Sequence, residues 1–242
     1  MNKKSIRKFG FVAFYILLIA LLYATTIKEG TDEKIRPHSS ETIISPEQTS
    51  EYDIFIDLNE SMLYLFKNGE LVNKYPVAQG KDNSPSPIGV WKITSKARNW
   101  GTGFGSRWMG IDVPWGIYGI HGTNKPYSIG QRASGGCFRM HNSDVEDLYS
   151  QVPYNTKVIV YGGPYKNLGS YTETLAPGDR TSHVLEVQVR LKLKEYYNGS
   201  IDGIYGEGMK QALLKFKKDQ GLPYTHFVDE ETYEALGILQ FD

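Results

Sequence analysis

The sequence predicts a mainly β central domain followed by a small all-α module of three helices, with a transmembrane helix at the N-terminus. Three observations support this prediction: an apolar run at residues 9–27, short alternating runs between residues 52 and 161, and helical periodicity after residue 184. The chain of 242 residues is 40% apolar and 13% aromatic and contains one cysteine. This composition allows a sizeable core, and it excludes disulfide scaffolds, collagen-like fibres and wholly disordered chains.

The formal net charge is zero, but the charges are unevenly distributed along the chain. Residues 1–27 contain Lys3, Lys4, Arg7 and Lys8 and no acidic residue, which leaves 23 basic against 27 acidic residues, or −4, for the remainder. A mildly acidic body without a basic cluster lacks the charge that binds phosphate backbones. We therefore expect no nucleic-acid partner.

The apolar run Phe9–Ile27 contains 19 residues, close to the roughly 20 that cross a hydrocarbon core. The basic residues before it favour a cytoplasmic N-terminus and place the rest of the chain outside. The sequence thus predicts a single-pass anchor in the cytoplasmic membrane. A cleaved signal peptide is the alternative, although Tyr23–Thr26 offers only a poor cleavage site.

The polar stretch at residues 28–50 has too few apolar residues to offset the entropy of ordering, and we interpret it as a tether. From residue 52 onward, short β-branched and aromatic runs are separated by Asn, Gly and Pro, which predicts antiparallel strands and hairpins. The expected strands lie at residues 52–58, 62–66, 71–72, 75–78, 89–94, 108–113, 118–121 and 157–161.

One helix is expected within the β domain, because Ser143–Glu146 matches a capping box and Pro153 ends the run that follows. Further along, apolar residues three and four apart predict the helices of the C-terminal module, the last two ending at Gly221 and Gly237. The predicted organisation is a cytoplasmic stub at 1–8, an anchor at 9–27, a tether at 28–50, a β domain at 51–162, a linker at 163–181 and a helical module at 182–242.

The residues best suited to catalysis surround the single cysteine. Cys137 follows Gly135 and Gly136, and His121 lies sixteen residues upstream at the end of a predicted strand. A lone cysteine is most often a small buried hydrophobic residue. Here the glycines clear the approach to the sulfur and can present backbone N–H groups to one small volume, as in an oxyanion hole. Because an ordinary thiol needs a base to become a nucleophile, His121 is the natural candidate.

Two other interpretations of this region have weaker support. Cys137, His141 and His121 could be three ligands of a catalytic zinc ion, but no further ligand spacing accompanies them. The glycines of Gly101–Gly105 are similar to a nucleotide-binding loop, but no parallel strand and helix are expected around them. We therefore predict no metal and no cofactor.

The segments around these residues resemble the L,D-transpeptidase (YkuD-type) catalytic domain of bacterial cell-wall enzymes. The signature of that family is a His-Gly pair, a spacer, and Ser/Thr-His-Gly-Cys followed by an aliphatic residue and Arg. Here it corresponds to His121-Gly122 and Ser134–Arg139, and Ser86–Trp91 is similar to an upstream segment of the family. The resemblance covers about residues 51–162 and implies an L,D-transpeptidase-like β-sandwich with a short helix.

This sequence departs from the family signature at two positions. Gly135 stands where the signature commonly has His, and Phe138 replaces an aliphatic residue. In the family the upstream histidine, which matches His121, is the base for the cysteine. The nucleophile and the base are therefore both present, and the departures bear on rate and on the choice of acceptor.

The C-terminal module resembles a second family, the three-helix peptidoglycan-binding domain. The resemblance rests on four segments, Val184–Leu191, Gly199–Gly206, Ala212–Phe216 and Val228–Leu236. The turn that contains Gly203 and Gly206 also makes physical sense by itself, because glycine permits tight backbone geometry before a helix. Both resemblances imply the same partner, peptidoglycan, through its stem peptides and its glycan.

The resemblance implies the following mechanism. His121, oriented by the Gly122 carbonyl, takes the proton of Cys137, and the thiolate attacks the amide between residue three of a stem tetrapeptide and its terminal D-Ala. D-Ala leaves, and an acceptor amine then resolves the thioester to form a cross-link. The oxyanion would be held by N–H groups of Gly136 and Cys137, with Gly135 as a further donor.

Four residues are candidates for substrate binding. Arg139 suits a substrate carboxylate because its planar guanidinium can donate two parallel hydrogen bonds, although a structural ion pair is the alternative. Ser134, Trp115 and Tyr118 are the other candidates; Ser134 could instead bond within the motif loop, and the two aromatic residues could belong to the core.

Three function classes follow from the sequence. The first is the cysteine transpeptidase, which becomes an L,D-carboxypeptidase if water replaces the acceptor. The second is a cell-wall hydrolase of papain-like or zinc type, and the third is a wall-binding protein without turnover.

Overall fold

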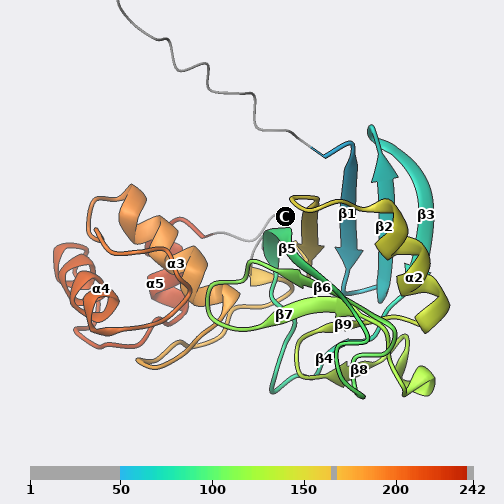
Figure 1. Cartoon of the computed structure of the whole chain (residues 1–242). Helices are drawn as coiled ribbons and strands as arrows, with labels where there is room; N and C mark the ends of the chain where they lie inside the picture. The colour runs from blue at the N-terminus through green and yellow to red at the C-terminus, as the bar shows by residue number, and fades with distance from the viewer. Residues whose placement is uncertain (1–49, 165–167, 239–242) are drawn as a thin grey trace, which may run out of the picture. The chain divides into compact units, whose positions relative to one another are not determined.

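The computed structural model describes residues 50–164 and 168–238 (Figure 1). The predicted stub, the anchor at 9–27 and the tether up to residue 49 lie outside the described residues. Within the described part of the chain, no helix is long and apolar enough to cross a membrane.

The described residues form a β domain and a helical module, as the sequence predicts. The strands are β1 Tyr52–Asp57, β2 Met62–Lys67, β3 Glu70–Pro76, β4 Gln79–Gly80, β5 Gly89–Arg98, β6 Arg107–Ile111, β7 Tyr118–His121, β8 Arg132–Ser134, β9 Phe138–Arg139 and β10 Lys157–Tyr161. The helices are η1 Pro126–Ser128, α2 Asn142–Gln151, α3 Ser182–Leu193, α4 Glu207–Asp219 and α5 Glu230–Ala235.

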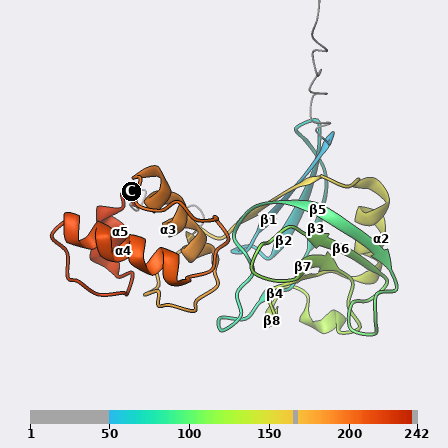
Figure 2. The same ribbon diagram turned by 60° about the vertical axis from the view of Figure 1, so that its left-hand side comes forward.

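Eight of these strands form one mixed sheet in the order β3-β2-β1-β10-β5-β6-β7-β9. The two halves of this sheet share the ten-residue strand β5, whose pairing with β6 shifts register between Ile93 and Ser95. The strands β1 to β3 and the strands β6 and β7 run in different directions on the two sides of this strand (Figure 2). The strands are therefore continuous through β5, and the two halves on either side of it pack into one apolar cluster.

The hairpins predicted from local sequence are present, because β1, β2 and β3 pair antiparallel, as do β5, β6 and β7. Three pairings are parallel instead: β1 with β10, β7 with β9, and β4 with β8. The sequence pattern did not predict β4, β8 and β9, since each has only two or three residues and is too short for a recognisable alternation.

The core of the sheet forms because side chains along each strand alternate between an inward and an outward direction. In β1 the side chains of Ile54 and Ile56 are fully buried, whereas Phe55 between them is partly exposed. Residues from both halves of the sheet, such as Trp91 and Ile120, belong to the same apolar cluster. Helix α2 adds Val145 and Leu148 to this cluster and packs against β6 and β7.

The predicted capping box of α2 is wrong. The helix begins at Asn142 with His141 as its N-cap, and no side chain caps it. Ser143 lies inside the first turn, where its hydroxyl bonds to Asp144. The Asn142 side chain accepts a hydrogen bond from the Ser106 N–H at 3.1 Å. This side chain therefore binds a neighbouring loop and does not cap the helix.

The C-terminal module contains the three predicted helices around a separate apolar cluster. Gly221 and Gly237 directly follow the C-caps of α4 and α5 and adopt φ of +69° and +74°, which confirms their prediction as C′ residues. Inside this module the fully buried Lys217 lies 3.2 Å from the Asp229 carboxylate and donates a hydrogen bond to Thr225.

The segment predicted as a linker also contributes to this module. Leu168 and Leu175 are buried in its cluster, and Leu175 pairs with Val228 across an isolated bridge. The Tyr233 hydroxyl donates a hydrogen bond to the Glu173 carbonyl at 2.8 Å. Glycine and proline predicted its irregular backbone correctly, but not its packing against the helices.

Candidate active site

Strands β7 and β9 bring the segments that contain the two central residues side by side. They pair parallel, with Ile120 opposite Phe138 and His121 opposite Arg139. Cys137 directly precedes β9, and both the Gly119 backbone of β7 and the Arg139 charge act on its thiol.

The imidazole of His121 is almost completely buried and is held by aromatic side chains. Trp108 stacks on it with ring centroids 5.7 Å apart, and Phe104 meets it edge-on at 4.9 Å. Its Nδ1 bonds to the Gly122 carbonyl. Since a carbonyl can only accept, this bond places the proton of the neutral ring on Nδ1 and leaves Nε2 without one.

Burial lowers the pKa of His121 to about 4, because the charged imidazolium loses its hydration there. Hydrogen bonds to the backbone of Gly122 and Phe104 oppose this shift, and the Arg139 charge reinforces it. The imidazole is therefore neutral at physiological pH, which is the form that a general base requires.

Burial also raises the pKa of the Cys137 thiol, while a hydrogen bond from the Gly119 backbone and the Arg139 charge act in the opposite direction. The sulfur lies 4.0 Å from the Ile117 carbonyl. No hydrogen bond joins the sulfur to His121 in the part of the chain that the structure describes. The Arg139 charge affects the pKa of both groups, so the thiol and the imidazole share one electrostatic environment.

The motif loop is held together by Ser134, which is buried. Its hydroxyl donates a hydrogen bond to the Cys137 carbonyl at 2.6 Å and accepts one from the Gly136 N–H at 3.1 Å. These bonds support the alternative given for Ser134, a role within the motif loop, and they give the Gly136 N–H an acceptor.

The two glycines before the cysteine have different structural roles. Gly136 has φ of +110°, and a Cβ there would lie 2.6 Å from the Tyr118 ring and 3.1 Å from the Pro85 carbonyl. Glycine is therefore required at position 136. At Gly135, by contrast, a Cβ would meet nothing closer than the Ser84 hydroxyl at 3.8 Å.

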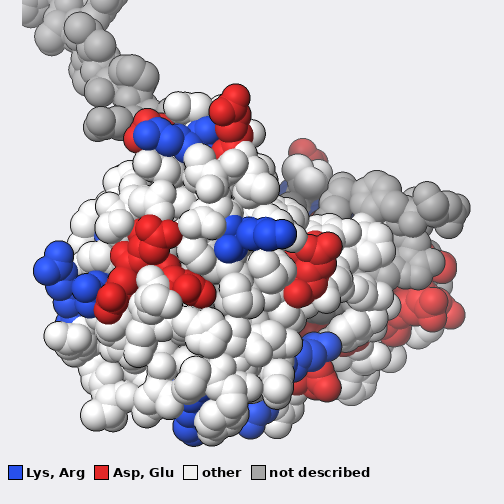
Figure 3. All heavy atoms as spheres, turned by 90° about the vertical axis from the view of Figure 1, so that its right-hand side faces the viewer, with Lys and Arg blue, Asp and Glu red and all other residues white. Residues whose placement is uncertain are grey.

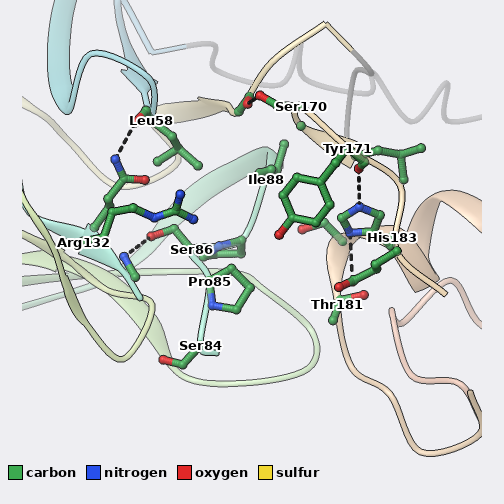
Figure 4. Close-up of a pocket in the computed structure, with 18 of the residues that line it drawn as sticks. Leu58, Ser84, Pro85, Ser86, Ile88, Arg132, Ser170, Tyr171, Thr181 and His183 are labelled. Atoms are coloured by element: carbon green, nitrogen blue, oxygen red, sulfur yellow. Dashed lines mark hydrogen bonds and ion pairs between the residues drawn. The ribbon is translucent and has the colours of Figure 1, made fainter. Parts of the chain in front are cut away.

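The predicted substrate residues Trp115 and Tyr118 lie at a cavity of about 370 Å³, part of which is shown in Figure 4. Trp115 is mostly buried and packs edge-on against Trp91, which favours the core interpretation for most of its ring. Tyr118 is only partly buried and lies against Gly136. Gly135 lines the same cavity, so the cavity reaches the motif loop.

The alternative interpretations gain no support from the geometry. Among residues 50–164 and 168–238, no group of three or more His, Cys, Asp or Glu side chains is placed to hold a metal ion. His141 serves as the N-cap of α2, and Gly101–Gly105 lies in the loop between antiparallel strands. On the face shown in Figure 3, acidic and basic side chains lie interspersed.

The aromatic enclosure of the proposed base is not evident from the sequence. Trp108 lies in a predicted strand and Phe104 in a glycine-rich loop, and neither position indicates a contact with the His121 ring. The available signal was the alternation of β6 and β7, because Trp108 stands opposite His121 in their register. No local pattern indicates that Phe104 folds back over the same ring.

Comparison with known proteins identifies the family. A protein of Bacillus licheniformis named "Putative L,D-transpeptidase YkuD" is 43% identical over 112 residues, which are 46% of this chain and 67% of that protein. The chain belongs to the L,D-transpeptidase family. The Bacillus subtilis protein of the same name is 41% identical over 112 residues, with the same shares covered.

Two family models match this L,D-transpeptidase. The model described as the L,D-transpeptidase catalytic domain matches residues 51–160, and the model described as "Putative peptidoglycan binding domain" matches residues 180–236. Both resemblances inferred from the sequence are thereby confirmed.

Solved structures of L,D-transpeptidases are also among the matches. A cysteine-to-serine mutant of the Enterococcus faecium L,D-transpeptidase is 25% identical, with a TM-score of 0.41. The match covers 47% of this chain and 50% of that one, so it spans about half the length of the solved protein.

Proposed function

We propose that this chain is a cysteine-dependent L,D-transpeptidase of peptidoglycan in which Cys137 is the nucleophile and His121 is the general base. The proposal is supported by the parallel pairing of β7 with β9, which sets His121 opposite Arg139, two residues after Cys137. The Arg139 charge acts on both the imidazole and the thiol. The absence of a direct bond between them does not argue against this assignment, because catalytic hydrogen bonds often tighten only when substrate binds.

Both groups are neutral in the resting enzyme, since burial raises the pKa of the thiol and lowers that of the imidazole. The proton therefore moves from Sγ to Nε2 of His121 as the sulfur attacks, rather than beforehand. The attacked carbonyl belongs to residue three of a donor tetrapeptide. The imidazolium then gives the proton to the leaving amine of D-Ala, and a thioester remains on Cys137.

The second half of the reaction reverses these roles. The amine of an acceptor stem attacks the thioester carbonyl, and His121 takes the proton that this amine loses. The C–S bond breaks, the cysteine recovers its proton from the imidazolium, and a new amide links the two stems. The Gly122 carbonyl orients the ring throughout, because its bond to Nδ1 leaves Nε2 as the nitrogen that exchanges the proton.

The oxyanion of each tetrahedral intermediate needs N–H donors from the motif loop. Gly136 donates to Ser134, so we assign this role to the N–H groups of Cys137 and Gly135. Loss of one such donor costs roughly 100- to 1,000-fold in rate in other enzymes. We assign Arg139 to a substrate carboxylate, because its charge acts on both reacting groups and its planar guanidinium can donate two parallel hydrogen bonds.

The remaining segments keep the enzyme at its polymer. The domain at 180–236 would bind peptidoglycan, and the predicted anchor at 9–27 would hold the chain at the outer face of the cytoplasmic membrane. Tethering raises the effective concentration of an insoluble substrate without new contacts at the active site.

The proposal is tested by incubating the full chain with a purified disaccharide-tetrapeptide and analysing the products by mass spectrometry. We expect a cross-linked dimer that has lost one D-Ala, and no product from Cys137→Ala. Tripeptide alone would instead assign an L,D-carboxypeptidase. Binding without any product, from wild type and variant alike, would refute an enzymatic function and leave a wall-binding protein.

A further inference from the structure

A cavity of about 370 Å³ lies beside the motif loop and includes groups that the mechanism above does not use. One wall comes from the turn at residues 83–88 and from Arg132 and Gly135. The opposite wall comes from residues 168–173 and from the start of α3. The Arg132 guanidinium and the Tyr171 hydroxyl extend into the space from opposite sides (Figure 4).

The wall that carries Arg132 is fixed relative to the nucleophile. Strand β8 contains Arg132 and Ser134, and it pairs parallel with β4. The Gly80 N–H bonds to the Ser86 hydroxyl at 2.9 Å, and the Lys81 N–H bonds to the Ser134 carbonyl at 3.2 Å. The cavity and the cysteine are therefore parts of one hydrogen-bonded unit, so a ligand in the cavity would have a defined position relative to Cys137.

The cavity is open at the motif loop because residue 135 has no side chain. Its backbone is not left-handed, and a Cβ would have only the Ser84 hydroxyl within 4 Å. A larger side chain is thus sterically allowed at 135 and would start next to Ser84, which also lines the cavity. The glycine therefore determines how much of the cavity remains free.

The charged groups of the cavity favour an anion. Glu173 is paired with His183 at 3.1 Å, so its carboxylate is already engaged. Arg132 contacts the Asp82 carboxylate at 2.8 Å, but both side chains are more than half exposed, and such pairs are weak. The planar guanidinium has five N–H donors and can bind a second carboxylate in the bidentate geometry that this group favours.

We propose that this cavity is a stem-peptide subsite in which Arg132 binds a free carboxylate of the peptidoglycan stem, and that Gly135 admits the stem to it. The proposal rests on the proposed function for the identity of the ligand. It adds a second arginine that recognises an anionic group of the stem, separate from Arg139, whose charge acts on the thiol and the imidazole.

The test uses the full chain with Cys137→Ala, so that binding is measured without turnover. Three tetrapeptide stems are titrated by calorimetry: one with free carboxylates at residues two and three, one amidated at residue two, and one amidated at residue three. Arg132→Gln should weaken binding of the free stem about tenfold, as expected for the loss of one charge-assisted contact. One of the two amidated stems lacks the carboxylate that Arg132 binds. Arg132→Gln should not change the affinity for that stem.

Controls separate this role from a structural one. Arg98→Gln removes an exposed arginine outside the cavity and should leave all three affinities unchanged, and Arg132→Lys should restore part of the loss. Gly135→His should weaken binding of the free stem at an unchanged melting temperature. Equal loss for all three stems, no loss for any of them, or no stem binding at all would overturn the proposal.

The active chain then distinguishes the two possible sources of the carboxylate. A higher KM for the donor with Arg132→Gln assigns the cavity to the donor stem, and a lower ratio of dimer to tripeptide assigns it to the acceptor stem. If wild type forms no product while Cys137→Ala still binds stems through Arg132, the proposed function fails and the subsite remains.

Discussion

The Ser134 hydroxyl donates a hydrogen bond to the carbonyl oxygen of Cys137, and so connects the residue before the two glycines to the residue after them. The same hydroxyl accepts the Gly136 N–H. One buried side chain therefore fixes the loop that presents the sulfur.

Removing this hydroxyl should damage both stability and activity. In Ser134→Ala, a buried N–H and a buried carbonyl lose their partner, which typically costs about 1–3 kcal/mol. Activity should fall further than stability explains, because the cysteine is no longer held in place. Urea denaturation and the cross-linking assay check this, with the exposed Ser143→Ala as the matched control. Equal behaviour of the two variants would contradict the role assigned to Ser134.

The two motif glycines should respond differently to the same substitution. Gly136→Ala forces a side chain into the left-handed region and against Tyr118, at a cost of about 1–3 kcal/mol. Gly135→Ala has ordinary backbone geometry and open space, so its free energy of unfolding should change by less than about 0.5 kcal/mol. Thermal denaturation of both variants provides the measurement. The prediction is wrong if Gly135→Ala is the more destabilised protein.

Stability should depend on pH through His121. Its pKa is about 4 in the folded state and near 6.5 when unfolded, so the unfolded chain binds the proton first as pH falls. The contribution of neutral His121 to the free energy of unfolding is about 3 kcal/mol. It is complete above pH 6.5 and is lost as pH falls toward 4. His121→Gln should lack this part of the pH dependence in urea denaturation between pH 4 and 7. Parallel curves for the two proteins would exclude a buried neutral imidazole.

The thiol should be protonated in the resting enzyme. Because burial raises its pKa, alkylation of Cys137 by iodoacetamide should be slow at neutral pH and should rise about tenfold per pH unit through the weakly alkaline range. Cys137→Ser gives the background rate. A rate that is already constant at neutral pH would indicate a preformed thiolate and imidazolium pair instead.

The buried Lys217 should make the helical module sensitive to loss of its partner. Asp229→Ala leaves this charge without its carboxylate and also removes the N-cap of α5, so we expect a loss of about 2–4 kcal/mol. Lys217→Met removes the charge itself and should cost less. Denaturation gives the free energy of unfolding of the two variants, and binding to isolated peptidoglycan is then measured for each. A greater loss of unfolding free energy for Lys217→Met would contradict the prediction.

Local patterns in the sequence were sufficient for much of this protein. Alternation located β1 and β2 within a residue, and Gly221 and Gly237 marked two helix ends, because these features depend on neighbours along the chain. The motif around Cys137 identified the family, since its spacing is specific. The capping box at Ser143 failed because the start of α2 is held by a contact with Ser106 on a distant loop.

What the sequence determined by itself was the set of elements and the chemical identity of the site: a cysteine, a histidine upstream and glycines between strands. Only the tertiary structure decided the parallel pairing of β7 with β9, the enclosure of His121 by Trp108 and Phe104, and the use of the Gly136 N–H by Ser134. The physical reason is that these relationships come from burying the faces of one continuous sheet together. In that core, segments far apart in the chain pack and form hydrogen bonds with one another. The local periodicity of the sequence does not indicate which segments will be in contact.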